Sequence, residues 1–177
     1  MKSYFYSQFG YIRYSVERFY LMKFKVPCDL EAVVFAESNI VINSNSDYIM
    51  KVLTNIKKWP KWRTDISKIE LLDSQVEEGS NFKWNSGGLR YNSNIHTLSR
   101  THFGWTGKTI GAFAIHNWYI EELTPLQSKV VVQESLNGWS IRLLRKSMES
   151  NLPKLISKDL QELKYECEHS IINEQKH

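Results

Sequence analysis

The sequence predicts an α+β fold in which an antiparallel sheet is followed by one long C-terminal helix. Apolar and polar residues alternate in short segments between Val33 and Asn137, which is the period of half-buried strands. Glycine, asparagine and serine pairs separate these segments and are typical of turns. After Gly138, apolar residues recur every three or four positions, as they do on one face of a helix.

The first predicted strand is followed by two short helices. VVFAESNIVI (33–42) alternates as a strand does, and residues 43–46 supply turn and N-cap chemistry. Residues 46–56 then carry apolar side chains at helical spacing. Pro60 ends this helix and opens a second short one in WPKWRTDI. We expect Arg63 and Asp65, just after it, at the surface or in a local pair.

Four short strands come next, at residues 66–72, 80–85, 89–98 and 101–108. Pairing the last two with Ile95 opposite Phe103 places the apolar residues on one face and the polar residues on the other. In this register His96 and His102 lie on the polar face, so we expect both to be exposed.

The last hairpin, residues 111–138, has the most informative register. If Glu122 lies opposite Ser128, the facing pairs are Ile120–Val130, Trp118–Val132, His116–Glu134 and Ala114–Leu136. This face is apolar except for His116 and Glu134. A slip of one residue would mix the two faces, which a half-buried sheet resists. Pro125 falls in the connection, where no ladder donor is needed.

The predicted C-terminal helix has one irregular position. Its apolar stripe comprises Ile141, Leu144, Met148, Leu152, Leu155 (or Ile156), Leu160 and Leu163. Pro153 falls inside the stripe, where it deletes a backbone hydrogen bond and crowds the preceding turn. We expect a kink there, or a break with Asn151 as the hinge.

Composition narrows the class of protein. The chain has 177 residues, 42% of them hydrophobic, and a net charge of +4 with scattered lysines. These values predict one globular domain and no nucleic-acid partner. Two distant cysteines, Cys28 and Cys167, and the lack of a secretory or membrane-spanning apolar run predict a cytoplasmic setting. The histidine and cysteine spacings indicate no metal site, and no cofactor is expected.

Residues 1–30 form a separate, aromatic-rich extension, and residues 171–177 a short tail. Phe5, Phe9, Ile12 and Val16 recur at helical spacing, so the extension can lie on a membrane surface or pack on the domain or a second subunit. Translation can also start at Met22. Membrane contact is expected, if at all, only through residues 1–25. The sequence leaves open whether the protein forms a homodimer.

Several ordered motifs resemble a known family. They are AESNIVINSNSDYIMKVLTNIKKWPKW (36–62), EEGSNFKW (77–84), NIHTLSRTHFGWTG (94–107), AIHNWYIEEL (114–123), VVVQESLNGW (130–139) and LQELKYECE (160–168). In order and spacing the chain resembles the START-related SRPBCC superfamily with its helix-grip fold, and within it the polyketide cyclase/dehydrase-like branch. The resemblance covers roughly residues 35–170 and places the domain at 31–170.

The resemblance implies a curved seven-stranded antiparallel sheet that wraps the long helix and leaves a cavity for a hydrophobic, lipid- or polyketide-like ligand. Combined with the registers above, it predicts a set of cavity-facing residues. They are Phe82, Trp84, Tyr91, Ile95, Phe103, Trp105, His116, Trp118, Val132 and Glu134 from the sheet, and Leu144, Met148, Leu152 and Leu155 from the helix.

Three functions follow from these expectations. The favoured one is binding without catalysis, because the sequence offers no complete catalytic set. The second is a cyclase- or dehydrase-like enzyme in which His116 and Glu134 form an acid/base pair, although the same pair can be a purely structural bridge. The third is an interaction or membrane-surface protein that acts through its N-terminal extension.

Overall fold

The structure is a computed structural model that describes residues 23–174. The predictions for residues 1–22, including the start at Met22 and contact with a membrane or a second subunit, therefore lie outside the described residues.

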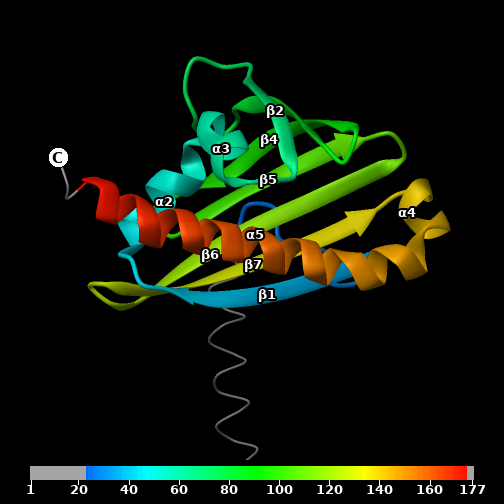
Figure 1. The fold of residues 1–177 in the computed structure, drawn as a ribbon. Helices are drawn as coiled ribbons and strands as arrows, with labels where there is room; N and C mark the ends of the chain where they lie inside the picture. The colour runs from blue at the N-terminus through cyan, green and yellow to red at the C-terminus, as the bar shows by residue number, and fades with distance from the viewer. Residues whose placement is uncertain (1–22, 175–177) are drawn as a thin grey trace, which may run out of the picture.

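The fold is built on one curved antiparallel sheet of seven strands, and a long helix, α5, lies across its concave face (Figure 1). The strand order is β1-β7-β6-β5-β4-β3-β2. The strands are β1 (Val34–Ile42), β2 (Ile66–Leu71), β3 (Asn81–Ser86), β4 (Leu89–Leu98), β5 (His102–Thr109), β6 (Ala112–Thr124) and β7 (Gln127–Asn137). The helices are α2 (Ser46–Thr54), the 3-10 turn η1 (Ile56–Lys58), α3 (Trp59–Trp62), α4 (Trp139–Leu143) and α5 (Arg145–Glu174). The predicted helix-grip arrangement is confirmed.

The two short helices after β1 form where the sequence predicts them. The Asn45 side chain accepts a hydrogen bond from the Tyr48 amide at 2.8 Å and caps α2. Ile49 and Leu53 on the inner side of α2 are buried. Pro60 lies in the first turn of α3, where its missing N–H costs no helical bond.

The β6–β7 hairpin has the predicted register. Glu122 pairs with Ser128, and His116 pairs with Glu134. Both faces follow the expected alternation, so a single apolar face lies toward α5. This part of the prediction is confirmed.

The β4–β5 hairpin does not have the predicted register. Ile95 pairs with Trp105 instead of Phe103, and Phe103 pairs with Leu98. The pairing shifts between Ile95 and Thr97, so His96 is the extra residue of a β-bulge. Because the displacement at Ile95 is two residues, Ile95, Phe103 and Trp105 still face the core.

His96 and His102 were predicted to be exposed, and that prediction is wrong: they are 9% and 4% exposed. The segment before β1 crosses the outer face of the sheet and covers them. Phe24 packs edge-on against His102 with ring centroids 4.8 Å apart. Farther along, the Val26 carbonyl accepts a hydrogen bond from the Asn117 side chain at 3.0 Å. The sheet is therefore covered on both faces at this place.

The C-terminal helical stretch breaks at Leu144, and the alternative of a break with Asn151 as the hinge is wrong. Gly138, with φ of 129°, lies directly against the Gly111 carbonyl, which also accepts a hydrogen bond from the Ser140 amide at 3.2 Å. These contacts hold α4 beside the β5–β6 turn. Helix α5 then continues through Pro153, whose exposed position lets water serve the carbonyl that loses its partner.

Among the described residues, no helix combines the length and the apolarity needed to cross a membrane.

Candidate functional site

The concave face of the sheet contains a polar couple among aromatic side chains. His116 on β6 and Glu134 on β7 are directly opposite each other. The same row continues to Trp105 on β5 and to Ala36 on β1. The alternation of these strands alone places the four side chains on the face that α5 covers.

The His116 ring is held on three sides. Nδ1 lies 2.9 Å from Oε2 of Glu134. The ring stacks on Trp105 with centroids 4.4 Å apart and planes 17° apart, and it lies 5.5 Å from the ring of Trp118. A carboxylate oxygen only accepts, so the proton of this hydrogen bond is on Nδ1. The other ring nitrogen, Nε2, is buried without a hydrogen-bond partner among the described residues.

A buried ion pair lies on the same side of the sheet. Arg63, which follows α3, donates to Oδ2 of Asp159 on α5 at 2.7 Å and to Oδ2 of Asp65 at 3.3 Å. The guanidinium lies over the rings of Trp59 and Trp84, 5.3 and 5.9 Å from their centroids. Of the two alternatives predicted for Arg63, a surface position is wrong, because its side chain is 4% exposed, and the local pair with Asp65 is present.

Burial raises the pKa of the Asp159 carboxyl to about 6, although Arg63 acts in the opposite direction. Burial alone would weaken the charge of Arg63, but Asp159 and Asp65 outweigh it and hold the pKa of the guanidinium above its usual value. The buried Arg63 guanidinium therefore stays charged, and the pKa of the buried Asp159 carboxyl lies closer to neutral pH than that of an exposed aspartate.

Asp159 is not among the site residues predicted from the sequence, although a signal for it exists. Leu152, Ile156, Asp159 and Leu163 follow one another at steps of four, three and four residues along α5. A carboxylate at a position that continues an apolar stripe has to be paired or neutralised. The predicted stripe consists of apolar residues alone and therefore does not include Asp159.

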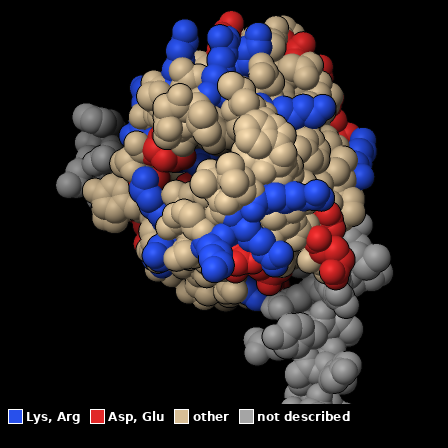
Figure 2. Space-filling view, turned by 90° about the vertical axis from the view of Figure 1, so that its right-hand side faces the viewer, with Lys and Arg blue, Asp and Glu red and all other residues tan. Residues whose placement is uncertain are grey.

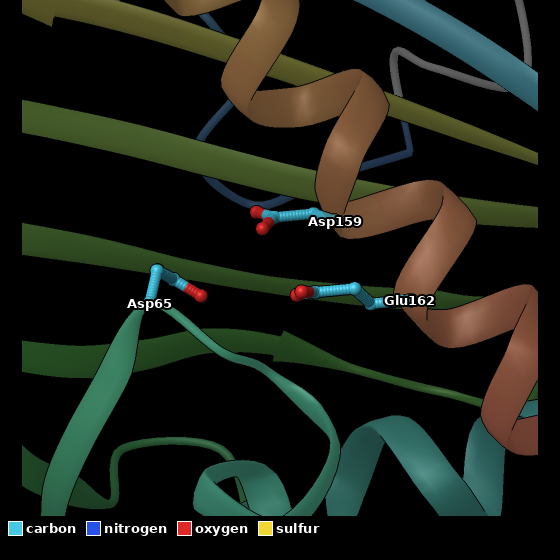
Figure 3. A group of neighbouring side chains, drawn as sticks. All are labelled: Asp65, Asp159 and Glu162. Atoms are coloured by element: carbon cyan, nitrogen blue, oxygen red, sulfur yellow. The ribbon is translucent and has the colours of Figure 1, made fainter.

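Three carboxylates meet beside this ion pair. The oxygens of Asp65, Asp159 and Glu162 lie within 4.8 Å of one another and point toward a common space (Figure 3). Each is already engaged: Asp65 and Asp159 by Arg63, and Glu162 by the Thr64 hydroxyl at 2.6 Å. These bonds attach the segment after α3 to α5 and account for the proximity of the three acids.

Large rings line the concave face toward β3. Trp84 and Tyr91 stack with centroids 4.6 Å apart, and Trp84 Nε1 donates to the Ser93 hydroxyl at 3.0 Å. Burial, with Glu134 and Asp65 adding to it, raises the pKa of Tyr91. Its phenol is therefore neutral and available as a hydrogen-bond donor at physiological pH.

Small side chains occupy the middle of the row next to His116. Ser93, Gly107 and Ala114 pair consecutively across β4, β5 and β6, so the sheet presents no large side chain to α5 at these three positions. A Cβ on Gly107 would meet only Ser93 Oγ at 3.4 Å and Ala114 Cβ at 4.0 Å. The concave side chains of Trp84, Tyr91, Ala114, Glu134 and Met148 are only half-buried. From the end where α4 lies, Figure 2 shows a narrow hollow on the surface.

The structure places most of the predicted ligand-binding residues on the concave side. Buried there are Phe82, Ile95, Phe103, Trp105, His116, Trp118, Val132 and Leu152. Half-buried are Trp84, Tyr91, Glu134 and Met148.

The prediction is wrong for Leu144 and Leu155, which are 54% and 47% exposed. Leu144 lies in the break between α4 and α5, which changes the phase of the stripe. Ile156, the alternative to Leu155, takes the buried position.

Comparison with solved structures gives the fold a family of relatives. A hypothetical protein from Helicobacter pylori superposes with a TM-score of 0.69, at 16% identity over 78% of this chain and 90% of that one. The ZhuI aromatase/cyclase from a Streptomyces species gives 0.68, at 12% identity over 77% and 94%. A START superfamily protein from Mycobacterium smegmatis gives 0.57, at 10% identity over 73% and 98%.

No family model and no curated protein sequence matches the chain. The structural similarity extends over about three quarters of the chain, with most of each neighbour covered. The resemblance inferred from the ordered motifs is thus confirmed at the level of the fold: the chain has the helix-grip fold of START-related proteins, which aromatase/cyclases share.

Proposed function

We propose that this protein binds a hydrophobic or aromatic small molecule, lipid- or polyketide-like, between the concave face of the sheet and α5, in the cytoplasm. The observation that carries the proposal is the row of Ser93, Gly107 and Ala114. Three adjacent small residues beside the large rings of Trp84, Trp105 and His116 leave room for a ligand, and the half-buried Trp84 and Glu134 next to them are within reach of solvent.

The chemistry of the lining supports the same function. Small-molecule sites are concave and mostly apolar, with a few placed polar groups that fix orientation. Here the apolar wall consists of tryptophan and tyrosine rings, and the polar groups are His116, Glu134 and the Arg63–Asp159 pair. Among the structural neighbours, the aromatase/cyclase from Streptomyces favours an aromatic or polyketide-like ligand over a simple fatty chain.

The proposal is tested by measuring, with native mass spectrometry, how a dye binds to the wild-type protein and to a variant whose site is filled. Purified protein is titrated with 1-anilinonaphthalene-8-sulfonate, and we expect saturable binding of one dye per chain. Ala114→Trp places a large ring into the row of small residues and should abolish this binding. Lys108→Trp, on an exposed position of the neighbouring strand, is the matched control and should bind as the wild type does.

The dye result can contradict the proposal in two ways. Binding that does not saturate, or that Ala114→Trp leaves intact, would place the dye elsewhere on the protein. Folding of each variant is checked by circular dichroism, so that loss of binding is not confused with loss of structure.

A cyclase- or dehydrase-like activity is the second candidate, and the His116–Glu134 hydrogen bond favours it. Glu134 holds Nδ1 and would stabilise an imidazolium, so Nε2 can take a proton from an acidic carbon between two carbonyl groups. The test is turnover of a poly-β-keto thioester by the wild type and by His116→Ala. Equal rates for the two proteins, or no turnover by either, would exclude an enzymatic role for this pair.

A further inference from the structure

Two neighbouring side chains on the concave face of β6 each contain a ring nitrogen without a hydrogen-bond partner. Nε2 of His116 and Nε1 of Trp118 are both buried, with no hydrogen-bond partner among the described residues. The residues themselves are 5% and 1% exposed. They are two positions apart on one strand, so their side chains lie on the same face, and their ring centroids are 5.5 Å apart.

An unpaired buried polar atom is costly, and native proteins rarely leave one without a partner. The neighbouring polar side chains show this rule: Trp59 Nε1 donates to the Leu53 carbonyl at 2.9 Å, and Trp84 Nε1 donates to Ser93 at 3.0 Å. His116 and Trp118 depart from this rule side by side on one strand, and Nε1 of Trp62 on α3 is the other unpaired ring nitrogen in this core among the described residues.

The two atoms are chemically complementary. Trp118 Nε1 carries a hydrogen and can only donate. In the neutral tautomer of His116 whose Nδ1 donates to Glu134, Nε2 has a lone pair and can only accept. A hydroxyl group is the smallest group that donates and accepts at once, and its oxygen can lie about 3 Å from a nitrogen on either side.

We infer that the ligand of the proposed site carries a hydroxyl, such as a phenol, that donates to His116 Nε2 and accepts from Trp118 Nε1. The inference rests on the proposed function and narrows its ligand class. A hydroxylated aromatic compound satisfies both nitrogens, whereas a plain hydrocarbon of the same shape buries them unpaired.

Three probes of nearly equal shape separate the contribution of the donated hydrogen bond from that of the accepted one. 2-Naphthol donates and accepts, 2-methoxynaphthalene only accepts, and 2-methylnaphthalene does neither. Water solvates a hydroxyl well, so an apolar site without polar partners would favour the methyl compound. By equilibrium dialysis with the wild-type protein, we expect 2-naphthol to bind roughly tenfold more tightly than 2-methylnaphthalene, and the methoxy compound to fall between them.

His116→Phe tests which residue accepts the hydroxyl proton. Phenylalanine keeps a ring stacked on Trp105 and removes both nitrogens, so the advantage of 2-naphthol over 2-methoxynaphthalene should disappear while 2-methylnaphthalene binds as before. Ser38→Ala is the matched control. It removes a hydroxyl that bonds to Ser157 on α5 and should leave the order of the three probes unchanged.

The outcomes distinguish this inference from the proposed function. Equal binding of the three probes by the wild type means that the nitrogens are served by a bound water only, and overturns the hydroxyl inference while the binding function stands. Absence of binding for all three overturns the binding function itself. If His116→Phe does not fold, the order of the probes on the wild type decides.

Discussion

Nδ1 of His116 donates a hydrogen bond to Oε2 of Glu134 across neighbouring strands, at 2.9 Å. The side chain of His116 is 7% exposed and that of Glu134 is 18% exposed. Water therefore reaches the carboxylate more readily than the imidazole. This difference in exposure determines how much free energy of unfolding the protein loses when either partner is removed.

Glu134→Gln and Glu134→Leu should differ in stability. Glutamine keeps an oxygen at the same place, so we expect a loss of about 0.5–1.5 kcal/mol in the free energy of unfolding. Leucine leaves the Nδ1–H of His116 buried without an acceptor, which adds about 1–3 kcal/mol. Urea unfolding measures both, and equal stability of the two variants would mean that the hydrogen bond contributes nothing.

Arg63→Met should destabilise the protein strongly near neutral pH. It removes the cation that pairs with the buried Asp159, and breaking such a pair typically costs about 3–5 kcal/mol. Arg90→Met, which removes the exposed partner of Glu70 at 3.8 Å, is the matched control and should cost at most about 1 kcal/mol.

The loss in Arg63→Met should also depend on pH. Burial already holds the pKa of Asp159 at about 6 in the folded protein, and removing Arg63 raises it further. A carboxyl with a raised folded pKa is favourable below its unfolded pKa, and this contribution is lost as the pH rises through the folded value. The variant should therefore recover stability toward about pH 5, and a loss independent of pH would show that Asp159 is not the cause.

The sequence was sufficient for the elements whose pattern is local. The β6–β7 register follows from alternation within one hairpin, because a slip would turn Trp118 and Val132 away from the core. Asn45 and Pro60 likewise determine where α2 and α3 begin, Asn45 through its capping side chain and Pro60 through its fixed backbone angle.

The sequence was not sufficient where distant segments meet. The bulge at His96 changes the β4–β5 pairing without changing the apolar pattern. Phe24 covers His102 from a segment far away in the sequence. The pairing of Arg63 with Asp159 joins residues 96 positions apart. The apolar stripe of α5 indicates that Asp159 needs a partner, but it does not indicate that the partner is Arg63.

His96 should make the protein less stable in acid. Burial lowers the pKa of its imidazole to about 4 in the folded protein, whereas the unfolded chain titrates at about 6.5. A depressed histidine pKa leaves stability complete above the unfolded value and removes it as the pH falls toward the folded value, by up to about 3 kcal/mol. Asp159 has the opposite sign in this range, so only a variant isolates the histidine.

His96→Gln is that variant, because glutamine does not titrate. Its stability relative to the wild type should rise as the pH is lowered from about 6.5 to about 4, as measured by urea unfolding at a series of pH values. His169→Gln, at an exposed position on α5, is the control. A constant difference between His96→Gln and the wild type over this range would contradict the assignment.

The same substitution should destabilise the protein at Gly104 and leave its stability nearly unchanged at Gly107, both on β5. A Cβ on Gly104 would lie 2.4 Å from Asn117 Oδ1 and 2.6 Å from His96 Cε1, where the segment before β1 already confines both side chains. Overpacking of this kind costs about 1–3 kcal/mol. On Gly107 the nearest atoms are at 3.4 and 4.0 Å, so alanine should change stability by no more than about 0.5 kcal/mol. Thermal unfolding of Gly104→Ala and Gly107→Ala measures the contrast. If both variants melt at the temperature of the wild type, the outer face at Gly104 is packed less tightly than these distances require. If both are destabilised equally, the row of Ser93, Gly107 and Ala114 is too tightly packed to take a methyl group.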